Sequence, residues 1–194
     1  MSSIIGHAAT GAAAYLTCNR FGNKQSLWVL PVFAFVAICP DFDYFAIWLF
    51  NYSANLRISH SILFTVIVSL LVWSGTRHPA VRTSANVPFV ALFLAALSHP
   101  VLDLLVGVHS VPLLWPLPSQ DVPVPGILPS AGRLALGNYY LWRNLLIESA
   151  ILLPALALLV ALARKVPIRT IARWALFVVP IWLVFLVWSL GLRR

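Results

Sequence analysis

Residues 87–107 read VPFVALFLAALSHPVLDLLVG, and the only ionisable side chains in this apolar run are those of His99 and Asp103. A helix needs about 20 predominantly apolar residues to cross the hydrocarbon core of a bilayer, so the run predicts a membrane helix. His99 and Asp103 are four positions apart, which places them on one helical face about 6 Å apart along the axis. The segment therefore predicts a membrane helix that carries a polar pair in its closing turns.

The whole chain shares this apolar character. Of its 194 residues, 61% are hydrophobic and 9% are charged, and the mean hydropathy is +0.91. This composition excludes an ordinary soluble domain. The 13 Lys and Arg outnumber the 5 Asp and Glu, but they are scattered between apolar runs, which is typical of anionic membrane surfaces and not of nucleic-acid binding. We therefore predict one integral membrane domain over residues 1–194, with lipids and not nucleic acid as its partners.

The pattern of apolar runs predicts an all-α fold, a polytopic membrane bundle of about six helices. The predicted helices cover residues 4–17, 27–49, 58–75, 87–107, 143–163 and 171–190. Segment 108–142, between the fourth and fifth helices, holds six of the 14 prolines. Because proline disfavours both helix and sheet, we expect this segment to form a loop along the membrane interface.

The basic residues predict the orientation of this bundle. Six spans would put eight of the 13 Lys and Arg on one side of the membrane and five on the other. Cytoplasmic loops of membrane proteins carry the excess of Lys and Arg, so the richer side is expected to be cytoplasmic. We therefore predict a multi-pass protein of the inner (plasma) membrane whose less basic end faces the periplasm.

Most of the acidic residues and histidines fall at this less basic end of the predicted bundle. They are His7, Asp41, Asp43, His60, His99, Asp103 and Glu148. An unpaired carboxylate below the membrane interface costs several kcal/mol, and only Arg57 and Arg143 are cations nearby. A bound divalent cation would balance these charges, because neutral imidazole and carboxylate are its usual ligands.

The stretch CPDFDYF, residues 39–45, holds two of these carboxylates. On a regular helix Asp41 and Asp43 would point in different directions. Pro40 biases Cys39 away from helical backbone, so a break in the helix is expected here. In an extended or turn backbone one carboxylate could bind a metal while its neighbour orients a ligand.

Each of these residues also has an interpretation without a metal. Asp41 could cap the next helical stretch, and His60 could stand at a capped helix start. His7 could form a hydrogen bond between helices, and His99 could simply pair with Asp103.

If the cluster holds one or two divalent ions, the reaction class is metal-assisted hydrolysis, in which the ion activates a bound water. Asp41 or Asp43 could then take the proton of that water, and Arg57 or Arg143 could hold a phosphate oxygen. A site at the bilayer surface favours a lipid or lipid-linked phosphoester as substrate, with the proline-rich loop as its cover.

Five motifs follow one another along the chain: GHAATG (6–11), PDFDYF (40–45), ISHSILF (58–64), LSHPVLDLL (97–105) and LLWPLP (113–118). This ordered set resembles the YdjM-like family of membrane-bound metal-dependent hydrolases. The chain is also distantly similar to zinc-dependent bacterial phospholipase C and the P1-type nucleases, all-helical enzymes that hold several metal ions with His, Asp and Glu. These enzymes end with a His-x-x-x-Glu pair, where this chain has Asn144 and Glu148.

The resemblance implies one to three divalent ions, zinc above all, and a full set of ligands. The implied ligands are His7, Asp41, Asp43, His60, His99, Asp103, His109 and Glu148. It also implies a phospholipase C-like hydrolase, in which Asp41, Asp43 and Arg57 have catalytic roles.

Two other classes of function stay open. An ion-coupled or proton-coupled transporter would also carry intramembrane Asp and His, but its ionisable groups would extend through the depth of the membrane. A non-catalytic membrane scaffold could retain the metal ligands without hydrolysing a substrate.

Overall fold

The structure, a computed structural model, describes residues 2–18, 29–50, 57–78, 87–106, 111–117, 126–130 and 136–192. Within these ranges the chain contains helices and no strands, and each of the six predicted segments contains a helix. The α-helices are α1 Ile4–Cys18, α3 Leu30–Ile38, α4 Asp43–Phe50, α5 Ile62–Arg77, α6 Phe89–Val106, α7 Tyr139–Ala163 and α8 Ile168–Leu190. The predicted all-α fold is confirmed.

The second predicted helix is interrupted where proline was expected to break it. Helix α3 ends at Ile38, a 3-10 turn, η1, covers Cys39–Phe42, and α4 begins at Asp43. Pro40 lies in the first turn of η1, and it has no N–H with which to continue the α-helical hydrogen bonds. The break places Asp41 and Asp43 on different elements, which decides their separate environments.

The proline-rich segment is shorter than predicted, because α7 begins at Tyr139 and not at residue 143. The side chain of Asn138 accepts a hydrogen bond from the backbone N–H of Tyr140, which is the usual way for Asn to cap a helix start. Helix α8 likewise begins at Ile168, three residues before its predicted start. The parts of the segment that the structure describes between α6 and Asn138 contain no regular helix.

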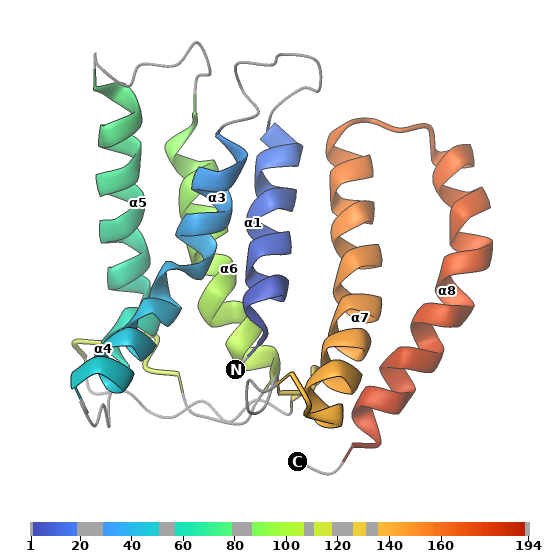
Figure 1. Cartoon of the computed structure of the whole chain (residues 1–194). Helices are drawn as coiled ribbons and strands as arrows, with labels where there is room; N and C mark the ends of the chain where they lie inside the picture. Colours follow the sequence, from blue (N-terminus) through green and yellow to red (C-terminus); the bar gives the residue numbers. More distant parts are fainter. Residues whose placement is uncertain are drawn as a thin grey trace.

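Helix α1 lies at the centre of the arrangement, in contact with α3, α6 and α7 (Figure 1). Its close approach to α3 depends on Gly11, because a Cβ there would lie 2.5 Å from the backbone oxygen of Phe33. Phe33 is fully buried and packs in a core with Tyr15 and Leu92. This contact fixes α1 against α3 and α6, and so brings His7 close to the side chains at the ends of those helices.

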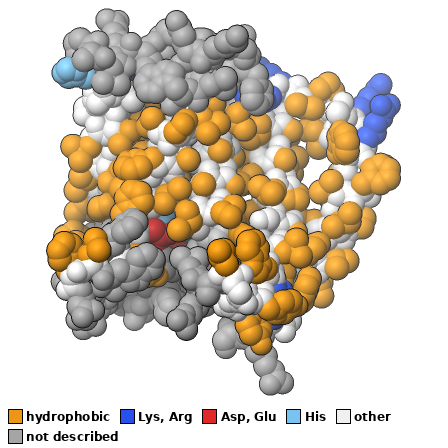
Figure 2. All heavy atoms as spheres, in the orientation of Figure 1, with side chains coloured by type: hydrophobic (Ala, Val, Ile, Leu, Met, Phe, Trp, Pro, Cys, Tyr) orange, Lys and Arg blue, Asp and Glu red, His pale blue; other side chains and the backbone are white. Residues whose placement is uncertain are grey.

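Three helices, α6, α7 and α8, are long and apolar enough to cross a membrane, and α5 and the Leu30–Phe42 stretch are shorter apolar helices. In Figure 2 hydrophobic side chains cover most of the described surface of the visible face, while basic side chains appear toward the ends of the bundle. This distribution is typical of a protein whose flanks contact lipid. The expected number of six spans stays a prediction.

Candidate metal centre

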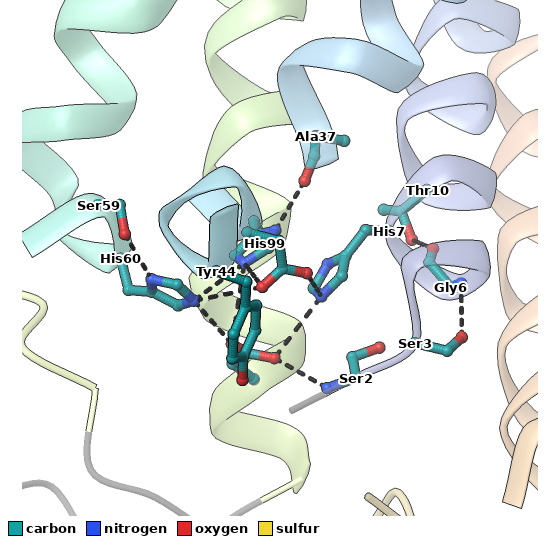
Figure 3. A network of polar contacts seen from close by, with 12 residues as sticks. Ser2, Ser3, Gly6, His7, Thr10, Ala37, Tyr44, Ser59, His60 and His99 are labelled. Atoms are coloured by element: carbon teal, nitrogen blue, oxygen red, sulfur yellow. Dashed lines mark hydrogen bonds and ion pairs between the residues drawn. The ribbon is translucent and has the colours of Figure 1, made fainter. Parts of the chain in front are cut away.

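Five buried polar side chains meet near one end of the bundle (Figure 3). They come from α1, η1, α6 and a second 3-10 turn, η2, which covers Ile58–His60. The five are His7, Asp41, His60, His99 and Asp103, and each is at most 7% exposed. The sequence assigns these residues to the ends of different helices. The structure brings their side chains together in one cluster.

The Nε2 atoms of His60 and His99 each lie near one oxygen of Asp103 and one oxygen of Asp41. His60 Nε2 lies 3.2 Å from both His99 Nε2 and Asp103 Oδ2. Asp41 Oδ1 lies 3.8 Å from His60 Nε2 and 3.7 Å from His99 Nε2. Donor atoms that surround a zinc ion tetrahedrally at about 2.0–2.1 Å are roughly 3.3 Å from one another. The donors of His60, His99 and Asp103 form one potential ligand group at separations close to these values, while Asp41 is grouped with His7 and His99.

His7 faces the other oxygen of each carboxylate. Its Nε2 lies 3.6 Å from Asp103 Oδ1 and 3.9 Å from Asp41 Oδ2. The His7 ring also stacks on the His99 ring, with centroids 3.8 Å apart. Asp41 and Asp103 thus each present one oxygen to His60 and His99 and the second oxygen to His7. Two overlapping groups of potential metal ligands result, one with His7 and one with His60.

The hydrogen bonds of the buried imidazoles support a metal site. Nδ1 of His99 lies 2.7 Å from the backbone oxygen of Ala37, which only accepts, so Nδ1 carries the proton and the lone pair of Nε2 faces the cluster. Both ring nitrogens of His7 are buried without a hydrogen-bond partner among the described residues. A buried polar atom without a partner costs free energy, and a cation among these donors would remove that cost. The residues present therefore fit a divalent metal ion.

Asp43 lies beside this cluster and pairs with Arg57. Arg57 donates from Nε to Asp43 Oδ2 at 2.8 Å and from Nη2 to Asp43 Oδ1 at 2.6 Å, a two-point ion pair. Arg57 Nη2 also lies 3.4 Å from Asp41 Oδ1, and the guanidinium stacks over the Tyr44 ring. Burial lowers the pKa of Arg57, but the hydrogen bond and the charge of Asp43 raise the pKa by more than burial lowers it. The net pKa of Arg57 is therefore above the ordinary value. Arg57 is therefore a permanent cation at the edge of the cluster.

Glu148 was expected among the ligands, and the structure places it at the start of α1. Its Oε1 accepts hydrogen bonds from the Ser2 hydroxyl and, at 3.0 Å, from the Ser3 backbone N–H. A carboxylate is favourable at a helix N-terminus because the backbone N–H groups there lack partners within the helix. Glu148 thus anchors the segment that carries His7 and is absent from both potential ligand groups.

Two other expectations concern residues near the proline-rich segment. Asn144, at the position of the expected His, donates from Nδ2 to the Ser130 backbone oxygen at 2.6 Å and accepts from Arg143. Its amide therefore supports the loop before α7. His109 lies outside the described residues.

Serines that the sequence did not single out also line the cluster. The Ser2 backbone N–H donates to Asp103 Oδ1 at 2.9 Å, and the Ser59 hydroxyl lies between Asp43 and His60. Ser3 accepts from the Gly6 N–H at 2.9 Å, the hydrogen bond of an N-cap. Two adjacent serines before an apolar helix were a signal for this cap, whereas the contacts with Asp103 and His60 depend on tertiary structure.

A comparison with known protein families matches residues 1–192 to the family described as YdjM inner membrane protein. The chain belongs to the YdjM family. The match confirms the resemblance to the YdjM family that the motifs indicated, and it supports a membrane location for this family member. No curated protein and no solved structure matches the chain.

Proposed function

We propose that this YdjM-family protein is a metal-dependent hydrolase that acts on a phosphoester of a lipid or lipid-linked substrate at the surface of the inner membrane. The observation that carries the proposal is the buried set of donors from Asp41, His60, His99 and Asp103, with one donor of each within 3.8 Å of His60 Nε2. When bound, a divalent ion such as zinc supplies Lewis-acid activation and lowers the pKa of a bound water.

The chain's residues divide into ligands and groups that act on the substrate. His60, His99 and Asp103 would hold one ion, and His7, Asp41 and His99 offer a further, overlapping position. The carboxylates of Asp41 and Asp103 are buried, so their negative charge needs a nearby cation to balance it. Buried charges are stable only when paired or bound to a metal.

Asp41 is better placed than Asp43 to accept a proton from a water molecule. Both Asp43 oxygens accept hydrogen bonds from Arg57, and Oδ2 also accepts one from Ser59 at 2.8 Å. Both oxygens of Asp43 are thus already occupied by hydrogen-bond donors. The second oxygen of Asp41, Oδ2, faces His7 at 3.9 Å and lies inside the cluster.

Arg57 is suited to hold an anionic group of the substrate next to the ligand set. Its Nη2 is 3.4 Å from Asp41 Oδ1, and its side chain is 21% exposed, so the guanidinium reaches both the cluster and the exterior. The neighbours Phe42 and Ile58 are 41% and 45% exposed. An anionic head group beside an apolar surface is the chemistry of a phospholipid, which supports the proposed substrate class.

The experiment compares wild-type protein with a His99→Ala, Asp103→Ala double variant, both purified in detergent, stripped with a chelator and reloaded with Zn²⁺. We expect the wild type to retain at least one ion per chain and to hydrolyse phospholipid phosphoesters, and the double variant to lose both properties. The matched control is His78→Ala, which removes an exposed histidine after the end of α5.

Two outcomes would contradict the proposal. Equal metal content in the wild type and the double variant would show that His99 and Asp103 do not hold the metal ion. Metal that is bound by the wild type and lost in the double variant, without hydrolysis of any phospholipid by either, would reject the enzymatic function and favour a metal-binding scaffold.

A further inference from the structure

We propose that Asp43 and Ser59 are positioning residues, which hold His60 with its proton on Nδ1 and so direct the lone pair of Nε2 into the candidate metal centre. This inference rests on the proposed function, because it concerns how a metal ligand of that site is oriented. It also assigns Asp43 a role different from the metal ligation that the sequence suggested.

The hydrogen positions follow from the chemistry of the three groups. The Ser59 hydroxyl lies 2.8 Å from Asp43 Oδ2. An ionised carboxylate only accepts hydrogen bonds, so the single hydroxyl proton of Ser59 points to Asp43. Ser59 Oγ also lies 3.0 Å from His60 Nδ1, and with its proton already donated it can only accept there. His60 Nδ1 must therefore carry the proton.

In this arrangement the His60 and His99 rings both carry a proton on Nδ1. His99 Nδ1 donates to the Ala37 backbone oxygen, and His60 Nδ1 donates to Ser59. When both imidazoles are neutral, as metal ligation requires, the Nε2 atoms of both rings carry lone pairs, and these two atoms lie only 3.2 Å apart. Two lone pairs at this distance repel each other, whereas two ligands of one cation are stable there. Partners of this kind on the far nitrogen of metal-binding histidines fix the ring and raise its basicity.

The local backbone explains why Ser59 can serve as the link. Turn η2 is closed by hydrogen bonds from His60 N–H to the Arg57 oxygen at 3.0 Å and from Ser61 N–H to the Ile58 oxygen at 3.1 Å. Ser61 then caps α5 by accepting from the Phe64 N–H. The turn is thus held between two elements, and Ser59 and His60 are both buried.

Asp43 connects this link to the edge of the site where a substrate anion would bind. Its Oδ2 accepts from both Ser59 and Arg57, each at 2.8 Å. One carboxylate therefore orients the candidate metal ligand His60 and the candidate anion-binding residue Arg57. Replacement of Asp43 should impair both, whereas replacement of Ser59 should impair the metal ligand alone.

The test measures Zn²⁺ affinity of the full-length protein in detergent by competition with a chromophoric chelator. We expect Ser59→Ala to lower the affinity about 10-fold to 100-fold, the range found when such partners of metal-bound histidines are removed. Ser59→Thr, which keeps the hydroxyl, should restore it to within a few-fold of wild type. The matched control is Ser69→Ala, because Ser69 is fully buried on α5 but donates to the Thr65 backbone oxygen.

A second readout separates orientation from a general loss of structure. Thermal unfolding of the metal-free proteins should give similar midpoints for Ser59→Ala and Ser69→Ala. With phospholipid substrate at saturating Zn²⁺, Asp43→Asn should raise KM, because Arg57 loses its ion pair, whereas Ser59→Ala should leave KM near the wild-type value.

The outcomes distinguish this inference from the proposed function. If the wild type binds Zn²⁺ and Ser59→Ala binds it equally well, the positioning role is wrong and the metal centre stands. An equal loss of affinity in Ser59→Thr and Ser59→Ala would also overturn the role of the hydroxyl. If the wild type binds no Zn²⁺, the proposed function fails and this inference falls with it.

Discussion

The Nε2 atoms of His60 and His99 lie 3.2 Å apart, although 39 positions separate the two residues in the chain. They come from η2 and α6, and Asp41 and Asp103 approach both of them. A cation bound between these donors would couple its binding to the stability of the folded state.

Zinc should stabilise the folded protein. An ion that binds only the folded state adds about 2.7 kcal/mol to the free energy of unfolding when its concentration is 100 times the dissociation constant. We expect the thermal unfolding midpoint of chelator-treated protein to rise on addition of Zn²⁺ and to fall again with excess chelator. The His99→Ala, Asp103→Ala variant should show no such rise, and a rise equal to that of the wild type would place the bound ion elsewhere.

Gly11→Ala should destabilise the contact between α1 and α3. The new Cβ would lie 2.5 Å from the Phe33 backbone oxygen and 2.9 Å from the Ala37 Cβ, and backbone cannot move aside cheaply. Overpacking of this kind costs about 1–3 kcal/mol. The matched control is Gly75→Ala, where a Cβ meets nothing within 4 Å, so its helix propensity should leave stability unchanged or slightly raised. Equal unfolding midpoints for the two variants would contradict the close approach at Gly11.

Glu148→Gln should lower stability without removing metal. The substitution replaces the charged carboxylate, which accepts hydrogen bonds from Ser2 and Ser3, with a neutral amide. A hydrogen bond to a charged group contributes about 1.5–3 kcal/mol. The unfolding midpoint of metal-free protein should therefore fall, while the number of Zn²⁺ ions per chain, measured by mass spectrometry, should match the wild type. Loss of one ion per chain would instead make Glu148 a ligand, as the resemblance to phospholipase C implied.

Arg57→Lys should weaken substrate binding more than metal binding. Lysine keeps the charge but cannot form the two-point ion pair that Arg57 makes with Asp43. The loss of about 1.5–3 kcal/mol corresponds to a 10-fold to 150-fold fall in kcat/KM on phospholipid phosphoesters. Arg77→Lys, on the last turn of α5, serves as the control. A kcat/KM for Arg57→Lys equal to that of the control would exclude Arg57 from anion binding.

Several features of the fold could be predicted because they depend on local properties of the chain. Apolar runs long enough for a membrane indicate helices whatever their neighbours are, and all six predicted segments contain one. Pro40 breaks the second helix as predicted, because the missing N–H and the ring of proline act on its immediate backbone. Helix α7 begins four residues before its predicted start, because the side chain of Asn138 caps it there.

The sequence alone determined which kinds of side chain occupy the helix ends, and the spacing of His99 and Asp103 placed that pair on one face. It could not decide which oxygen of which carboxylate faces which imidazole. Asp41 and Asp43 are two residues apart, yet Asp41 faces three histidines while Asp43 pairs with Arg57. Glu148 lies at Ser2 and Ser3, 145 or more positions away. Hydropathy and helical spacing are local, whereas the direction of a buried polar side chain depends on partners that only the assembled helices bring within hydrogen-bonding distance.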